Sequence, residues 1–100
     1  MAAALMCAYL RDDLAAPDAM TRLEQFAGEQ GFQLAETVHT TDPQAGFEQL
    51  SVAVARAECQ HVVMPSKAHL HGVPADRLAR LRRGGVWIWF EESDRGGGAR

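Results

Sequence analysis

The chain has 100 residues, of which 47% are hydrophobic and 23% are charged, and its formal net charge is −3. This length suits one small domain with a single core, and the composition is that of a soluble globular protein. No apolar stretch approaches the roughly 18 residues that cross a bilayer, and the opening residues lack the positively charged start of a signal peptide. We therefore expect a cytoplasmic protein with no membrane partner.

The first half of the chain alternates apolar runs with amphipathic segments. Residues 4–10, ALMCAYL, are entirely apolar, as is typical of a strand buried on both faces. Residues 16–31 predict a helix, because their apolar side chains recur on one helical face and a glycine closes the segment. A strand is expected at 32–39 from its period-two pattern. A second helix is expected at 44–58, with Asp42 as its N-cap.

The second half continues the alternation and ends in a polar segment. Residues 61–64, HVVM, predict a short buried strand, and 65–72 predict a loop. A third helix is expected at 74–85, and the apolar run VWIWF predicts a fourth strand at 86–90. Glycine and charged residues dominate 91–100, which we predict to be a flexible tail.

This order of elements predicts an α/β fold. Strands that alternate with helices form parallel sheets with right-handed crossovers, and helices then cover both faces. We expect a three-layer, mostly parallel, four-stranded sheet in one domain over residues 1–90, followed by the tail at 91–100.

Charge is distributed unevenly along the chain. Residues 1–58 carry nine acids and three bases, whereas residues 59–90 carry five bases and one acid. The basic cluster of the third helix consists of Arg77, Arg80, Arg82 and Arg83. A protein that holds DNA unaided usually has a strong basic field. The acidic balance therefore indicates that this chain does not bind nucleic acid strongly without a partner. The cluster is expected to be a solvated face, and the alternative is a contact for an acidic partner or, weakly, for nucleic acid.

Several short motifs together resemble the catalytic domain of the resolvase/invertase family of serine recombinases. They are YLRDD (9–13), TDPQAG (41–46), HVVMPSKAHL (61–70) and GGVWIWF (84–90), and the similarity covers nearly all of residues 4–90. The resemblance implies a resolvase-like fold. It also implies a site at the carboxyl ends of the strands, where ligands collect in α/β proteins.

The same resemblance implies that this site is degenerate. Tyr9 and Arg11 match the family's first motif, but Asp13 stands where the family has the serine that attacks a DNA phosphodiester. Asp42 matches an acidic position after the second strand. His69 replaces the first arginine of the third motif and Gly72 the second. An aspartate repels phosphate, and neither a neutral histidine nor a glycine neutralises it, so we expect no catalytic residues.

Other interpretations of these residues find less support. Asp12 and Asp13 resemble the Mg²⁺ pocket of receiver domains, but the third strand ends in Met64-Pro65 instead of an aspartate. The aspartates are therefore expected to be solvated, with one capping a turn or pairing with Arg11.

Metal binding and nucleophilic catalysis are the remaining chemical alternatives. Three histidines, at 39, 69 and 71, suggest zinc but lack a supporting cysteine or carboxylate, so we predict no metal and no cofactor. Ser66-Lys67 lacks an oxyanion partner. Cys7 and Cys59 are expected on or beside adjacent strands, where they could lie close together as two small buried hydrophobes and not as a redox pair.

The fourth strand carries the strongest hint of an interaction. Trp87 and Trp89 alternate with three other apolar residues, so both faces of a predicted edge strand are apolar. The two tryptophans either pack under a helix or leave an exposed aromatic surface, which usually marks a protein contact. We predict a protein partner or a homodimer formed through this strand.

Three functions follow from these observations. The first is a resolvase-like domain that has lost catalysis and acts as a regulatory or protein-interaction module. The alternative is a diverged or truncated serine recombinase that binds DNA or assists a partner recombinase. The third, a binder of small ligands at the carboxyl edge, rests on fold analogy alone.

Overall fold

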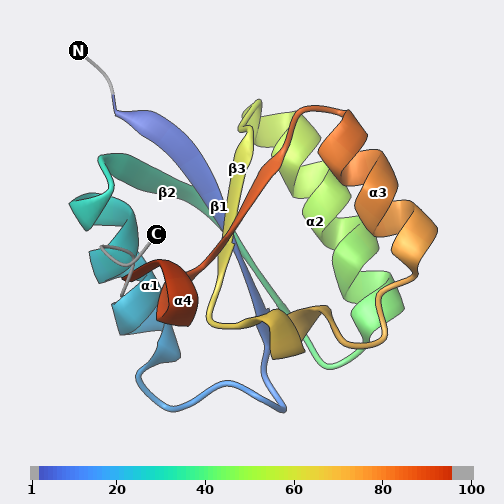
Figure 1. Cartoon of the computed structure of the whole chain (residues 1–100), viewed down its shortest axis with the longest axis horizontal. Helices are drawn as coiled ribbons and strands as arrows, with labels where there is room; N and C mark the ends of the chain where they lie inside the picture. Colours follow the sequence, from blue (N-terminus) through green and yellow to red (C-terminus); the bar gives the residue numbers. More distant parts are fainter. Residues whose placement is uncertain (1–2, 96–100) are drawn as a thin grey trace.

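A computed structural model describes residues 3–95, and its centre is a four-stranded, all-parallel sheet (Figure 1). The strands are β1 (Ala4–Arg11), β2 (Phe32–Thr40), β3 (His61–Met64) and β4 (Trp87–Phe90), in the spatial order β2-β1-β3-β4. The helices are α1 (Ala19–Glu29), α2 (Pro43–Ala57), the 3₁₀ helix η1 (Lys67–Leu70), α3 (Ala75–Arg83) and α4 (Glu91–Arg95). The predicted α/β class and four-stranded sheet are confirmed.

β1 lies between β2 and β3, and both faces of its apolar residues 6–10 are covered. Met6, Ala8 and Leu10 join a buried cluster beneath α1, while Cys7 and Tyr9 join a second cluster beneath α2. Figure 1 shows α1 and α4 on one side of the sheet and α2 and α3 on the other. The predicted three layers are therefore confirmed.

The amino-terminal end of α2 is held close to the end of β2. Asp42 caps the helix by accepting the backbone N–H groups of Gln44 (3.0 Å) and Ala45 (3.3 Å), as predicted. Gly46 lies against Thr40, where an added Cβ would come within 2.2 Å of Thr40 Cγ2. Only glycine at position 46 allows this approach, which brings the α2 N-terminus beside the carboxyl edge of the sheet.

The prediction of a flexible tail from residue 91 is wrong for residues 91–95, which form α4. Glu91 is 1% exposed, and both of its carboxylate oxygens lie 3.2 Å from the Arg22 guanidinium on α1. The backbone N–H of Phe90 donates to Asp94 Oδ2 at 2.9 Å. These polar contacts stabilise α4, and the rest of the predicted tail, 96–100, lies outside the described residues.

The predicted loop at 65–72 also differs from the structure, because it contains η1. Among residues 3–95, no helix is long and apolar enough to cross a membrane.

Candidate functional site

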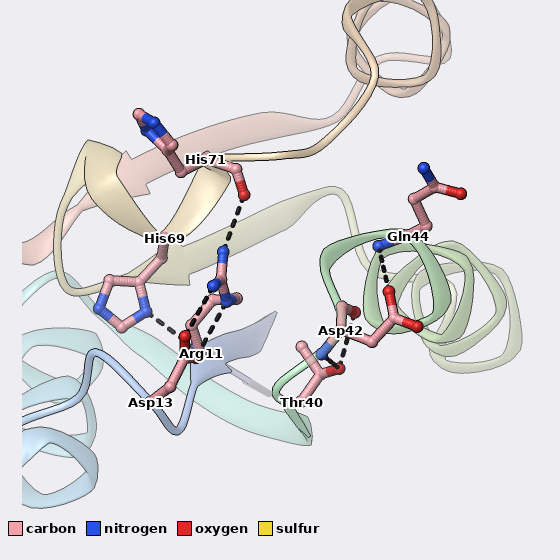
Figure 2. A network of polar contacts seen from close by, with 7 residues as sticks. All are labelled: Arg11, Asp13, Thr40, Asp42, Gln44, His69 and His71. Carbon is pink, nitrogen blue, oxygen red and sulfur yellow. Dashed lines mark hydrogen bonds and ion pairs between the residues drawn. The ribbon is translucent and has the colours of Figure 1, made fainter.

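Polar side chains from the ends of two strands and from η1 gather at the carboxyl edge of the sheet (Figure 2). Arg11 ends β1, Thr40 ends β2, and His69 lies in η1, just after β3. Parallel strands end at the same edge, so residues far apart in the chain meet there. A hollow of about 390 Å³ opens at this edge, lined by Arg11, Leu14, Pro43, Ala68, His71 and Gly72.

The central contact of the site is a two-point ion pair between Arg11 and Asp13. Arg11 Nε donates to Asp13 Oδ1 at 3.0 Å, and Nη2 donates to Oδ2 at 2.7 Å. The third donor direction is also used, because Nη1 donates to the His71 carbonyl oxygen at 2.8 Å. Hydrogen bonding to Arg11 holds the pKa of Asp13 below its ordinary value, so this carboxylate stays ionised.

His69 is a buried anchor for the end of β1. Its Nδ1 accepts the backbone N–H of Arg11 at 2.9 Å, so that nitrogen carries no proton and the hydrogen is on Nε2. Burial, followed by the charge of Arg11, lowers the pKa of His69 below its ordinary value. The ring is therefore neutral at pH 7, and Nδ1 is already occupied by the backbone.

Asp42 and His39 have local partners as well. Asp42 Oδ1 accepts the two α2 N–H groups, so this carboxylate acts as a helix cap. Thr40 Oγ1 bonds the Asp42 backbone, accepting from N–H at 2.9 Å and donating to the carbonyl at 2.8 Å. His39 Nδ1 lies 2.9 Å from Asp12 Oδ1 in an exposed pair. None of these groups converges on the His69 ring, and residues 3–95 contain no cluster of three metal ligands.

Tyr9 lies beneath this edge, fully buried in the cluster on the α2 side. Its ring meets the ring of Phe47 edge-on, with centroids 6.2 Å apart. Within residues 3–95 its hydroxyl has no hydrogen-bond partner. Burial raises the pKa of this hydroxyl, so Tyr9 stays protonated.

The structure thus brings Arg11, Asp13 and His69 into one connected group, with Tyr9 beneath it and Asp42 at the neighbouring helix end. The expected pairing of an aspartate with Arg11 is found. The sequence did not indicate that the His71 carbonyl oxygen accepts a hydrogen bond from Arg11. A backbone carbonyl leaves no trace in residue type, so no sequence signal could have identified that acceptor.

The two tryptophans of β4 occupy different environments. Trp87 is 69% exposed. Trp89 packs edge-on against Phe26 and Phe32, and its Nε1 donates to His61 Nδ1 at 3.2 Å. The prediction that Trp89 lies on an exposed interaction surface is therefore wrong, because its side chain packs in a partly buried aromatic cluster with residues of α1 and β2.

The basic cluster lies along α3. Arg77 is half-buried and pairs with Glu48 on α2 at 3.6 Å. Arg80, Arg82 and Arg83 are exposed in the last turn. The basic cluster is separate from the group formed by Arg11, Asp13 and His69. The end of α3 lies beside the amino end of β4, and β4 then runs toward the carboxyl edge (Figure 1).

The chain is similar to a solved recombinase structure. No protein-family model and no curated protein sequence matches the chain. Among solved structures, the chain is similar to the C-terminal catalytic domain of ISC1926 TnpA, an IS607-like serine recombinase, with a TM-score of 0.64 and 18% sequence identity. The similarity covers 87% of this chain and 68% of that one. The fold of this chain is therefore that of a resolvase-like serine recombinase catalytic domain.

Proposed function

We propose that this chain is a resolvase-like domain that has lost recombinase catalysis and acts through protein contact, with a second copy of itself as the partner. The observation that carries the loss of catalysis is the two-point pair between Arg11 and Asp13. Asp13 occupies the place that the family resemblance gives to the nucleophile. Its carboxylate holds the cation that would otherwise bind phosphate.

Electrostatics support this assignment. A phosphodiester at this edge would meet the Asp13 carboxylate, which Arg11 keeps ionised. All three nitrogens of the Arg11 guanidinium already donate, two to Asp13 and the third to the His71 carbonyl oxygen. His69 is neutral and held by the backbone. Catalysis of phosphoryl transfer depends on positive groups aimed at developing charge, and the Arg11 charge at this edge is instead paired with Asp13.

Covalent trapping tests the loss of catalysis. Supercoiled plasmid DNA carrying a recombination site is incubated with the purified chain, and detergent-resistant protein–DNA adducts are measured together with nicking. We expect neither adducts nor nicks. A detergent-resistant adduct that protease digestion maps to any residue of this chain would disprove the proposal.

The contact surface that we propose is the outer edge of β4. Trp87 is exposed there, beside a hollow of about 390 Å³ lined by Arg82, Gly85, Val86, Trp87 and Ile88. In residues 3–95, β4 pairs only with β3, so its other side is an open edge. Open edges with exposed apolar side chains favour pairing with another strand.

Backbone bonds leave one outward-facing residue in the middle of this edge. The Trp87 N–H donates to Gln60 before β3, so by alternation Ile88 and Phe90 direct their N–H groups outward. Asp94 already accepts the Phe90 N–H, and Leu81 O accepts the Val86 N–H at 3.4 Å. Ile88 is therefore the natural centre of a symmetric antiparallel pair, in which two copies exchange N–H and C=O bonds at this residue.

Charge favours a second copy as the occupant. Arg82 and Arg83 lie before the amino end of β4, and Glu92 follows its carboxyl end. In an antiparallel pair the basic end of one strand lies beside the acidic end of the other, so the surface is complementary to itself. A parallel arrangement would place like charges together.

Sedimentation velocity over a range of concentrations tests this contact. We expect a reversible, concentration-dependent dimer that Trp87→Ala dissociates. Val52→Ala is the matched control, because Val52 is 57% exposed on α2 near the opposite edge and should leave the dimer unchanged. In a Trp89→Phe background, Trp87 fluorescence should shift to the blue as the dimer forms. A monomer at every concentration, or equal weakening by both alanine variants, would overturn the assignment of this surface.

A second candidate function is DNA binding through the basic cluster. The observation in its favour is that Arg80, Arg82 and Arg83 are exposed together at one helix end. A gel-shift titration at low salt should then show binding that the pair Arg80→Ala and Arg82→Ala weakens, with a reduced salt dependence. The absence of any shift would remove this candidate.

A further inference from the structure

The two cysteines of the chain meet inside the protein. Cys7 is in the middle of β1, and Cys59 lies between α2 and β3, 52 positions later. Their Sγ atoms are 2.8 Å apart, and both residues are free thiols. A disulfide has a sulfur separation of about 2.05 Å, so the sulfurs need to close by less than about 1 Å to bond.

The two thiols differ in access. Cys7 is 0% exposed, because sheet neighbours and α2 cover it, whereas Cys59 is 4% exposed beside the surface turn that ends α2. That turn contains Glu58, which has a left-handed backbone conformation (φ 53°). Cys59 Sγ also lies 3.6 Å from the His61 carbonyl. A small local opening of this turn would expose Cys59 before Cys7.

We propose that Cys7 and Cys59 form a redox modification site, which a small-molecule disulfide of the glutathione class converts to an intrachain bond. The proposal is independent of the assigned function, since neither cysteine lies at the carboxyl edge or on the β4 edge. In a reducing compartment the pair is dithiol, and oxidative stress supplies the disulfide reagent.

The reaction proceeds by two exchanges. The Cys59 thiol loses its proton to solvent, and its thiolate attacks the reagent disulfide, forming a mixed disulfide and releasing one reagent thiolate. The Cys7 sulfur then attacks Cys59 Sγ and releases the second reagent thiolate, which takes up the proton that the Cys7 thiol loses; the first released thiolate is protonated by solvent. In total, two protein thiols are oxidised to one disulfide, and one reagent disulfide is reduced to two thiols.

The reactivity of Cys7 supports this order. Burial and the hydrogen bond with Cys59 raise the pKa of Cys7 to about 12. Since the thiolate is the nucleophile, Cys7 is a poor first attacker at neutral pH. Once Cys59 carries the reagent, the two sulfurs are neighbours, and proximity favours the second step.

Mass spectrometry on the folded wild-type protein tests the proposal. After incubation with oxidised glutathione, we expect a monomer that is lighter by two hydrogen atoms, has no titratable thiol, and yields one cross-linked peptide joining Cys7 to Cys59. Dithiothreitol should restore both thiols. The oxidised protein should melt at a temperature higher by on the order of 10 °C, because the bond closes a long loop in the unfolded chain.

Single-cysteine variants supply the matched controls. Cys7→Ala should accumulate the mixed disulfide at Cys59, and it should do so faster than Cys59→Ala accumulates it at Cys7. Incubation with oxidised glutathione should not raise the melting temperature of either variant. The proposal is overturned if the wild type stops at a mixed disulfide, or if its thiols react only after unfolding in urea.

Discussion

Replacement of Tyr9 by phenylalanine should stabilise the protein. The Tyr9 ring is fully buried against Phe47, yet its hydroxyl has no partner among residues 3–95. A buried hydroxyl without a partner costs about 1–3 kcal/mol, whereas the ring contacts survive in phenylalanine. We expect the free energy of unfolding to rise by about 1 kcal/mol, which corresponds to about 4–8 °C in a domain of this size.

Alkaline pH should widen the difference between Tyr9→Phe and the wild type. Burial raises the pKa of Tyr9 in the folded state above the ordinary value of 10.0. The folded protein therefore favours the neutral phenol, and this contribution is complete below pH 10 and is lost as pH rises toward the folded pKa. The variant has no such group and keeps its stability there.

Urea unfolding followed by circular dichroism, at pH 7 and at a pH clearly above the ordinary tyrosine pKa of 10.0, measures both effects. Tyr9→Ala serves as the control for packing and should lose about 3–5 kcal/mol, because it removes the ring as well. If Tyr9→Phe were less stable than the wild type by 1 kcal/mol or more, roughly the net value of one hydrogen bond, the hydroxyl would have a stabilising partner and the reasoning would be refuted.

Three further predictions concern the site and its supports. Gly46→Ala places a methyl group against Thr40 and should cost about 1–3 kcal/mol in thermal unfolding, and an unchanged melting temperature would show that the contact relaxes freely. Asp42→Ala removes the α2 cap and should cost about 1 kcal/mol in urea unfolding, whereas Asp42→Asn should keep most of it. Burial lowers the pKa of His69, so the contribution of its neutral ring to stability is present above pH 6.5 and is lost as pH falls. His69→Asn can still accept the Arg11 N–H, so this variant should lose less stability than the wild type when the pH is lowered. Parallel profiles of unfolding free energy against pH would contradict this prediction.

Much of the fold could be predicted because its local signals agree with its tertiary structure. The apolar β1 run has a buried environment on both sides, and Asp42 before a proline caps α2 as its residue type suggests. The missed elements were η1 and α4, and α4 is a polar segment whose helix depends on the contact between Arg22 and Glu91. These residues are 69 positions apart. No local pattern can indicate such a partner.

The candidate site was predictable by position and less so by role. Strand order placed Arg11, Asp13 and His69 at one edge. The sequence left open which of the two aspartates pairs with Arg11, and the structure shows that it is Asp13. The use of His69 Nδ1 by the β1 backbone depends on the path of η1, which had no clear sequence pattern. Likewise, alternation puts Trp87 and Trp89 on one face of β4. Trp89 is packed and Trp87 is exposed because Phe26 of α1 and Phe32 of β2 contact Trp89.

The position of α4 has a practical consequence for expression and labelling. A stop codon after Phe90 would keep all four strands in the sequence. It would remove the Glu91 carboxylate, which pairs with Arg22, and Asp94, which accepts the Phe90 N–H. Affinity tags and fluorophores are therefore better attached beyond residue 95, and shortened clones should keep the EESDR segment.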